Sequence, residues 1–150
     1  MAQNIKEFDR VVAFILSELY QKFPVRTHVS IYEVFDCPSG KITDYEWVES
    51  EELKQSDQEF YYFTVQWLLD TGYVIGTINH YNDSKITLSM KGLELLKSVP
   101  SSVDSSESIG DQLVSAFKSG AKDSAANIIS KALSSTNLFA QLSDLFASSH

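Results

Sequence analysis

The stretch that decides the fold spans residues 68–93 and reads LLDTGYVIGTINHYNDSKITLSMKGL. Its first two leucines, Leu68 and Leu69, belong to the end of a helix, and Gly72 is the residue that lets the chain reverse out of that helix. Residues 73–78 are rich in β-formers and predict a strand, residues 79–84 read as a polar turn, and residues 85–88 predict a second strand. Ser89 stands where a helix N-cap is expected. The stretch therefore predicts a helix, a β-hairpin and another helix in direct succession.

Two longer helices are predicted before this stretch. Residues 4–23 place apolar side chains at spacings of three and four, which is the period of one helix face, with Asn4 as the N-cap and Pro24 ending the helix. Residues 56–71 have the same period, with Ser56 as the N-cap. Apolar residues surround most of the second helix, which is typical of a helix buried on several sides. We expect Phe60, Phe63 and Trp67 to pack in the core.

The region between these helices is less regular. Residues 25–31 alternate between apolar and polar side chains and read as a short strand, whereas residues 31–35 read equally well as a short helix. Residues 36–55 read as a polar loop with a Cys-Pro-Ser-Gly turn and several glutamates.

The composition changes after residue 98. Residues 99–108 are rich in serine and predict a linker. Residues 109–147 again show helical spacing, on a narrow apolar face with many alanines, and Leu138, Leu142, Leu145 and Phe146 continue the pattern. Such a face cannot bury itself alone. The segment is therefore a solvated tail, or it docks on the first domain or on a second copy of the chain.

The predicted order of elements over residues 4–98 resembles that of a winged helix-turn-helix domain. The most specific likeness is the helix-Gly-strand at residues 68–74, followed by the hairpin and the return ITLSMKGL at residues 86–93. This resemblance implies an α+β, mainly helical fold, with a winged-helix-like three-helix core, a β-hairpin wing and C-terminal helices after it. It also implies that the helix before the wing can enter the DNA major groove.

The charge pattern departs from the DNA-binding version of that family. The chain has 12 Lys and Arg residues against 20 Asp and Glu residues, a net charge of −8. No Lys or Arg occurs between Gln55 and Ser84, which covers the implied recognition helix and most of the wing. Since phosphate contacts from Lys and Arg supply much of the affinity for DNA, nucleic-acid binding is disfavoured. A transcriptional regulator using helix 56–71 and wing 73–88 stays the alternative.

Catalytic and metal-binding patterns are missing from the sequence. The three histidines lack metal-ligand spacing, the glutamates at residues 46–52 lack the order of a calcium loop, and phosphate-loop and hydrolase motifs do not occur. Cys37 is the only cysteine, so an internal disulfide is impossible and a reducing compartment is expected. We expect a cytoplasmic protein that is not an enzyme, has no cofactor and does not insert in a membrane.

These patterns favour a non-enzymatic protein-interaction module that self-associates through the first helix and the C-terminal helices. Tyr62, on the flank of helix 56–71 with Gln66, is the best candidate for an exposed contact, and Tyr61 is the next. The larger apolar residues of the C-terminal segment complete the set of candidate partner contacts, namely Leu113, Phe117 and Ile128.

Overall fold

The computed structural model describes the backbone of residues 2–100 and 106–148, and side chains as far as residue 135. The fold is α+β and mainly helical, as expected from the sequence, and it contains two small β-hairpins where one was expected. The elements in chain order are α1 (Gln3–Lys22), α2 (Ile31–Val34), β1 (Lys41–Thr43), β2 (Glu46–Val48), α3 (Gln55–Asp70), β3 (Val74–Ile78), β4 (Ser84–Leu88), α4 (Met90–Lys97), α5 (Ile109–Lys118) and α6 (Lys122–Ser148).

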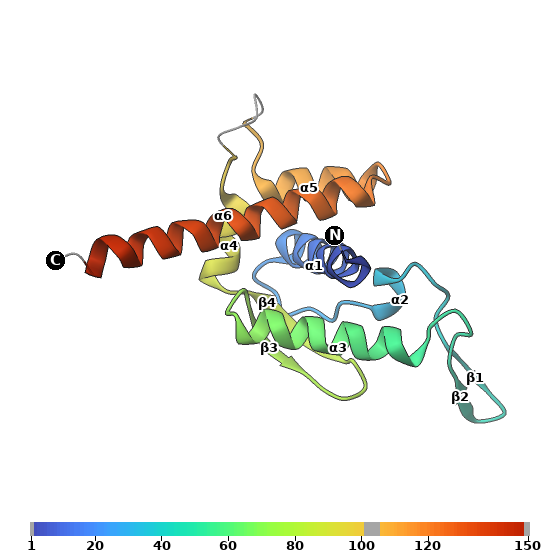
Figure 1. The fold of residues 1–150 in the computed structure, drawn as a ribbon. Coiled ribbons are helices and arrows are strands. Elements are labelled where there is room, and N and C mark those ends of the chain that lie inside the picture. Colours follow the sequence, from blue (N-terminus) through green and yellow to red (C-terminus); the bar gives the residue numbers. More distant parts are fainter. Residues whose placement is uncertain (1, 101–105, 149–150) are drawn as a thin grey trace.

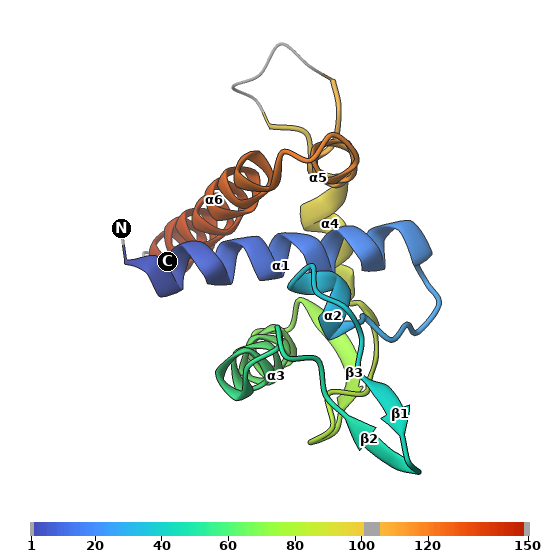
Figure 2. The same ribbon diagram turned by 90° about the vertical axis from the view of Figure 1, so that its right-hand side faces the viewer.

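Helix α1 lies at the centre, between two layers (Figure 2). Helices α5 and α6 pack on one side of it, and α3 with the β3–β4 hairpin lies on the other. The middle of α1 is therefore buried almost all round, including small residues such as Ala13 and Ser17 that allow close packing. All of these layers share one hydrophobic core cluster.

The stretch at residues 68–93 folds as its sequence predicts. Gly72 has a φ of +81°, the left-handed conformation in which glycine ends a helix most easily. Strands β3 and β4 pair antiparallel, from Val74 opposite Leu88 to Ile78 opposite Ser84. The Ser89 hydroxyl caps α4 by accepting a hydrogen bond from the Gly92 amide at 3.0 Å, and it donates to the Gly72 carbonyl. Ser89 thereby fixes where α3, the hairpin and α4 meet.

Other local predictions were wrong in part. Of the two alternatives left open for residues 25–35, the short helix is confirmed as α2. Of the strand at residues 25–31, only Thr27 pairs, through a bridge to Ile86. The loop expected at residues 36–55 contains the β1–β2 hairpin, whose turn places Asp44 and Tyr45 at positive φ (Figure 1). Two residues at positive φ are what a tight hairpin turn requires, but the sequence lacks the usual Asn-Gly or Asp-Gly signal.

The predicted helix caps were also misplaced. The N-cap of α1 is Ala2 rather than Asn4, and that of α3 is Lys54 rather than Ser56. At α3 the Asp57 carboxylate, at position N3, accepts a hydrogen bond from the Lys54 amide at 3.1 Å. This bond satisfies the N-cap amide at the start of the helix.

The C-terminal helices dock on the rest of the chain. Leu113 of α5 and Ile129 of α6 are fully buried, and Phe117 packs edge-on against Phe14 of α1 with ring centroids 5.4 Å apart. The Ile109 amide donates to the Ser98 carbonyl, which joins the two ends of the predicted linker. Residues 101–105 of that linker lie outside the described residues, and so do the side chains from residue 136 onward.

One carboxylate is buried between α1 and α6. Asp9 is only 8% exposed, and the Ser130 hydroxyl hydrogen-bonds to it. Burial raises the pKa of Asp9 above its ordinary value of 3.8, and the hydrogen bond from Ser130 opposes that shift without cancelling it. The α1–α6 contact therefore favours a protonated Asp9.

We expect Leu113→Ala to lower the free energy of unfolding by about 2–5 kcal/mol, because it empties a fully buried site between α5 and α1. Ile42→Ala, at an exposed position of β1, should change it by less than about 0.5 kcal/mol. Urea unfolding of both variants checks this. Equal stabilities of the two variants would show that the docked position of α5 is wrong.

We also expect Asp9→Asn to stabilise the protein at neutral pH. Because the pKa of Asp9 is higher in the folded than in the unfolded chain, its protonation contributes to the free energy of unfolding. This contribution is complete below pH 3.8 and is lost as the pH rises through the folded pKa. The gain over wild type should therefore disappear near pH 3.8 and grow as the pH rises. Asp123→Asn, at an exposed carboxylate 3.6 Å from Arg10, is the control and should show little change. A gain independent of pH would contradict the assignment.

Candidate functional site

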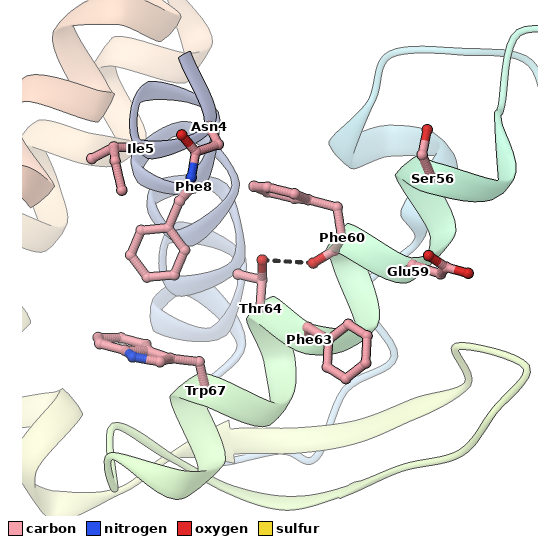
Figure 3. Close-up of a pocket in the computed structure, with 9 residues that line it drawn as sticks. All are labelled: Asn4, Ile5, Phe8, Ser56, Glu59, Phe60, Phe63, Thr64 and Trp67. Atoms are coloured by element: carbon pink, nitrogen blue, oxygen red, sulfur yellow. Dashed lines mark hydrogen bonds between the residues drawn. The ribbon is translucent and has the colours of Figure 1, made fainter. Parts of the chain in front are cut away.

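A groove opens between the first turns of α1 and the length of α3. Its volume is about 460 Å³, and Figure 3 shows its walls facing each other across the opening. On α3, the positions at three- and four-residue spacing from Phe60 form one wall, since they share a helix face. The described lining residues are Asn4, Ile5, Phe8, Ser56, Glu59, Phe60, Phe63, Thr64 and Trp67.

Aromatic contacts hold the walls of this α1–α3 groove in place. Trp67 lies between Phe8, whose ring meets it edge-on at 4.9 Å, and Tyr73, whose ring stacks on it at 6.0 Å. Such pairs are worth roughly 0.5–1.5 kcal/mol each beyond the area they bury. The groove is therefore built into the packing of α1, α3 and the residue that precedes β3.

The groove nonetheless leaves large apolar side chains open to solvent. Phe63 is 66% exposed, Ile5 is 44% exposed and Trp67 is 37% exposed. The Thr64 hydroxyl donates to the Phe60 carbonyl at 2.7 Å, so its polar atom is already satisfied. Glu59 is the one charged residue among the described lining residues. This chemistry suits apolar side chains of another polypeptide better than a phosphate or a polar substrate.

The prediction that α3 is buried on several sides was thus wrong in part. Tyr61, Thr64, Val65 and Leu68 are buried, whereas Phe63 and Trp67, which the pattern assigned to the core, are exposed. The apolar residues around most of the helix were the available signal for an exposed apolar surface. A sequence pattern, however, does not show which faces of a helix another element covers.

Tyr61 is not a surface contact, and its prediction as one was wrong. Its side chain is fully buried, and its hydroxyl donates to the Val29 carbonyl at 2.6 Å and lies 3.4 Å from the Ser84 hydroxyl. The Ser84 hydroxyl accepts from the Val29 amide at 3.0 Å. Burial raises the pKa of Tyr61 to about 12. This network joins α3, the segment before α2 and the start of β4.

The flank of α3 beside the β3–β4 turn is partly exposed. Gln66 donates to the Tyr62 hydroxyl at 3.2 Å, and the Tyr62 ring stacks on His80 at 5.6 Å and meets Phe63 edge-on at 5.5 Å. Tyr62 and Gln66 thus lie next to the groove, on the side of the β3–β4 turn. Their role as partner contacts stays a prediction.

The three predicted partner contacts in the C-terminal helices are buried within the chain to different degrees. Leu113 is fully buried against α1, so it offers no surface to a partner, and that prediction was wrong. Phe117 and Ile128 are half-buried beside the same core. They stay predictions as partner contacts.

Lys and Arg residues are sparse in α3 and the β3–β4 hairpin, where Lys85 is the one cation. In the described part of the chain, the hydrogen bonds and ring contacts of Tyr62 and Asn82 involve no Lys or Arg. Lys91 is held elsewhere, with its ammonium 4.2 Å from the centroid of the Tyr73 ring and donating to the Thr71 carbonyl at 2.9 Å. Among the described residues, the groove lining holds no Lys or Arg, and the β3–β4 hairpin holds one, the exposed Lys85. This is little positive charge to attract a phosphate backbone.

A second exposed apolar surface lies on the β1–β2 hairpin. The exposed residues there are Ile42, Tyr45, Trp47 and Val48, and none of them lines the groove. Figure 1 shows the hairpin near the start of α3. Sequence reasoning missed this surface because it treated the region as a polar loop.

The remaining polar features offer little for catalysis. Among the described residues, no three His, Cys, Asp or Glu side chains lie close enough together to hold a metal ion. Burial and the carboxylates of Glu52 and Asp57 raise the pKa of Cys37, which disfavours the nucleophilic thiolate. A polar cavity of about 90 Å³ beside His28 and Asn82 has room for a few water molecules.

Comparisons with known proteins give no family for this chain. No family model matches it, and neither a curated protein nor a solved structure does. Within the described ranges, every helix is too short or too polar to cross a bilayer.

We expect Tyr61→Phe to cost about 1–3 kcal/mol of stability, because it leaves the buried Val29 carbonyl without its hydrogen bond. Tyr62→Phe, at a half-buried hydroxyl, is the matched control and should cost less than about 0.5 kcal/mol. Denaturant unfolding of both variants measures the difference.

Tyr61 should also affect how the free energy of unfolding falls at alkaline pH. A pKa raised from 10 to about 12 favours folding fully below pH 10 and loses that contribution as the pH rises toward about 12. Tyr61→Phe should therefore lose less stability than wild type over that interval. An equally steep loss would contradict the burial of Tyr61.

Proposed function

We propose that this protein is a non-enzymatic protein-interaction module with a winged-helix-like core, and that it self-associates through the α1–α3 groove and its C-terminal helices. The observation that carries the proposal is the exposed aromatic groove on α3, the helix that a DNA-binding relative of this architecture would present to the duplex. That helix carries Phe63 and Trp67 at its surface and no Lys or Arg.

The element order supports the winged-helix-like part of the proposal. Helix α1 is followed by the Thr27 bridge, α2, α3, the β3–β4 hairpin and α4, and the bridge places the segment before α2 beside β4. The β1–β2 hairpin separates α2 from α3, which departs from a short helix-turn-helix connection.

The balance of forces supports protein over DNA as the partner. A net charge of −8 repels a phosphate backbone, and the repulsion is strongest at low salt. Apolar side chains at the groove gain free energy when another apolar surface covers them, at roughly 25 cal/mol per Å² buried. Contact with a polypeptide therefore uses what this surface offers, whereas contact with DNA does not.

The proposal predicts a protein that is larger than one chain in solution and does not bind duplex DNA. Light scattering over a concentration series should give a mass above that of one chain. Titration of labelled mixed-sequence duplex at low salt should show no saturable binding. A mass equal to one chain at all concentrations would refute self-association, and tight binding with a steep salt dependence would favour the regulator instead.

A further inference from the structure

Helix α6 is longer than its packing on α1 requires. It has 27 residues, and its buried residues in the described part are Ala125, Ile129, Ala132 and Leu133, all in its first half. Beyond Leu133 the helix continues to Ser148, a length of about 22 Å at 1.5 Å per residue. In Figure 1 these last turns extend to the left of the rest of the fold.

The sequence of this extension is suited to a groove. Residues 136–148, here called the α6 arm, read TNLFAQLSDLFAS. Leu138, Leu142, Leu145 and Phe146 share one helical stripe by their spacing. The one charged residue of the arm, Asp144, falls on the other side of the helix by the same spacing.

The α1–α3 groove matches that stripe in chemistry and length. Its walls carry Phe8, Phe63 and Trp67, and Glu59 is its one charge among the described lining residues. Along α3 the lining runs from Ser56 to Trp67, about 16 Å, and the stripe from Leu138 to Phe146 spans about 12 Å. An amphipathic helix that lays three or four apolar side chains into an apolar groove is a common mode of recognition.

The arm does not meet the groove of its own chain. Figures 1 and 2 both place the end of α6 away from α3, and one continuous helix joins that end to the turns docked on α1. A second copy of the chain carries the same arm and the same groove. In a pair of copies, the arm of each chain can therefore reach the groove of the other.

We propose, resting on the self-association proposed above, that the α6 arm of one chain binds in the α1–α3 groove of a second copy. The exchange is reciprocal in a two-fold dimer, because each chain supplies one arm and one groove. Such a contact closes on itself and leaves neither apolar surface in water.

Charge placed on the stripe tests the arm. Leu142→Asp should weaken the dimer of the full chain by roughly ten- to a hundredfold, because it replaces a leucine that the proposed contact buries by a carboxylate. Ala140→Asp adds the same charge on the opposite side of the helix and should leave the dimer intact. Sedimentation equilibrium measures both, and unchanged denaturant unfolding of the monomer shows that Leu142→Asp still folds.

A matched pair of substitutions tests the groove. Phe63→Ser should weaken the dimer by a similar factor, whereas Tyr45→Ser, at an exposed aromatic outside the groove, should not. Both side chains are exposed, so neither change should unfold the chain.

Cross-linking identifies which surfaces meet. In a Cys37→Ser background, Phe63→Cys and Leu142→Cys chains are mixed and oxidised. We expect a disulfide between the two different chains. Efficient coupling of Leu142→Cys chains to each other alone would show that two arms pair, and would overturn the groove as their site.

The outcomes separate this inference from the proposed function. A wild-type mass of one chain at all concentrations would refute both. A wild-type dimer that survives Leu142→Asp but not Phe63→Ser would overturn the arm as occupant while self-association through the groove stands.

Discussion

The structure depends on the need to cover helix α1 on opposite sides. Its central turns bury side chains in nearly every direction, so a single layer against it would leave apolar surface in water. The layer of α3 and β3–β4 covers one side, and α5 with α6 covers the other. The C-terminal helices are thus part of the core rather than an addition to it, and they contribute Leu113, Ala125 and Ile129 to the same cluster.

These two layers do not fully cover the first turns of α1. At the first turns of α1, Ile5 and Phe8 face α3 across a groove. Trp67 is held by rings on both sides, so the surface is shaped before any partner arrives. A preformed apolar surface costs little conformational entropy on binding, which is the condition for useful affinity from a small contact.

Sequence reasoning was most accurate where local chemistry decides the structure. Gly72 and Ser89 have few alternatives, because a left-handed helix end and a hydroxyl cap are strong local preferences, and the stretch between them folded as predicted. It failed where tertiary contacts decide. Tyr61 and Phe63 are two residues apart on one helix, yet one is fully buried and the other is mostly exposed. The β1–β2 hairpin was missed because its strands have three residues each and its turn lacks glycine.

The comparison between fold and charge carries the functional argument. A helix before a wing can read a duplex only if cations bring the two surfaces together, because the phosphates must be neutralised before base edges are reached. The exposed positions of α3 include Glu59, Phe63 and Asp70, and the helix holds no Lys or Arg. A surface of aromatic rings beside carboxylates repels the backbone of a nucleic acid and is stabilised by apolar cover. In this chain α3 therefore presents an apolar groove rather than a cationic surface.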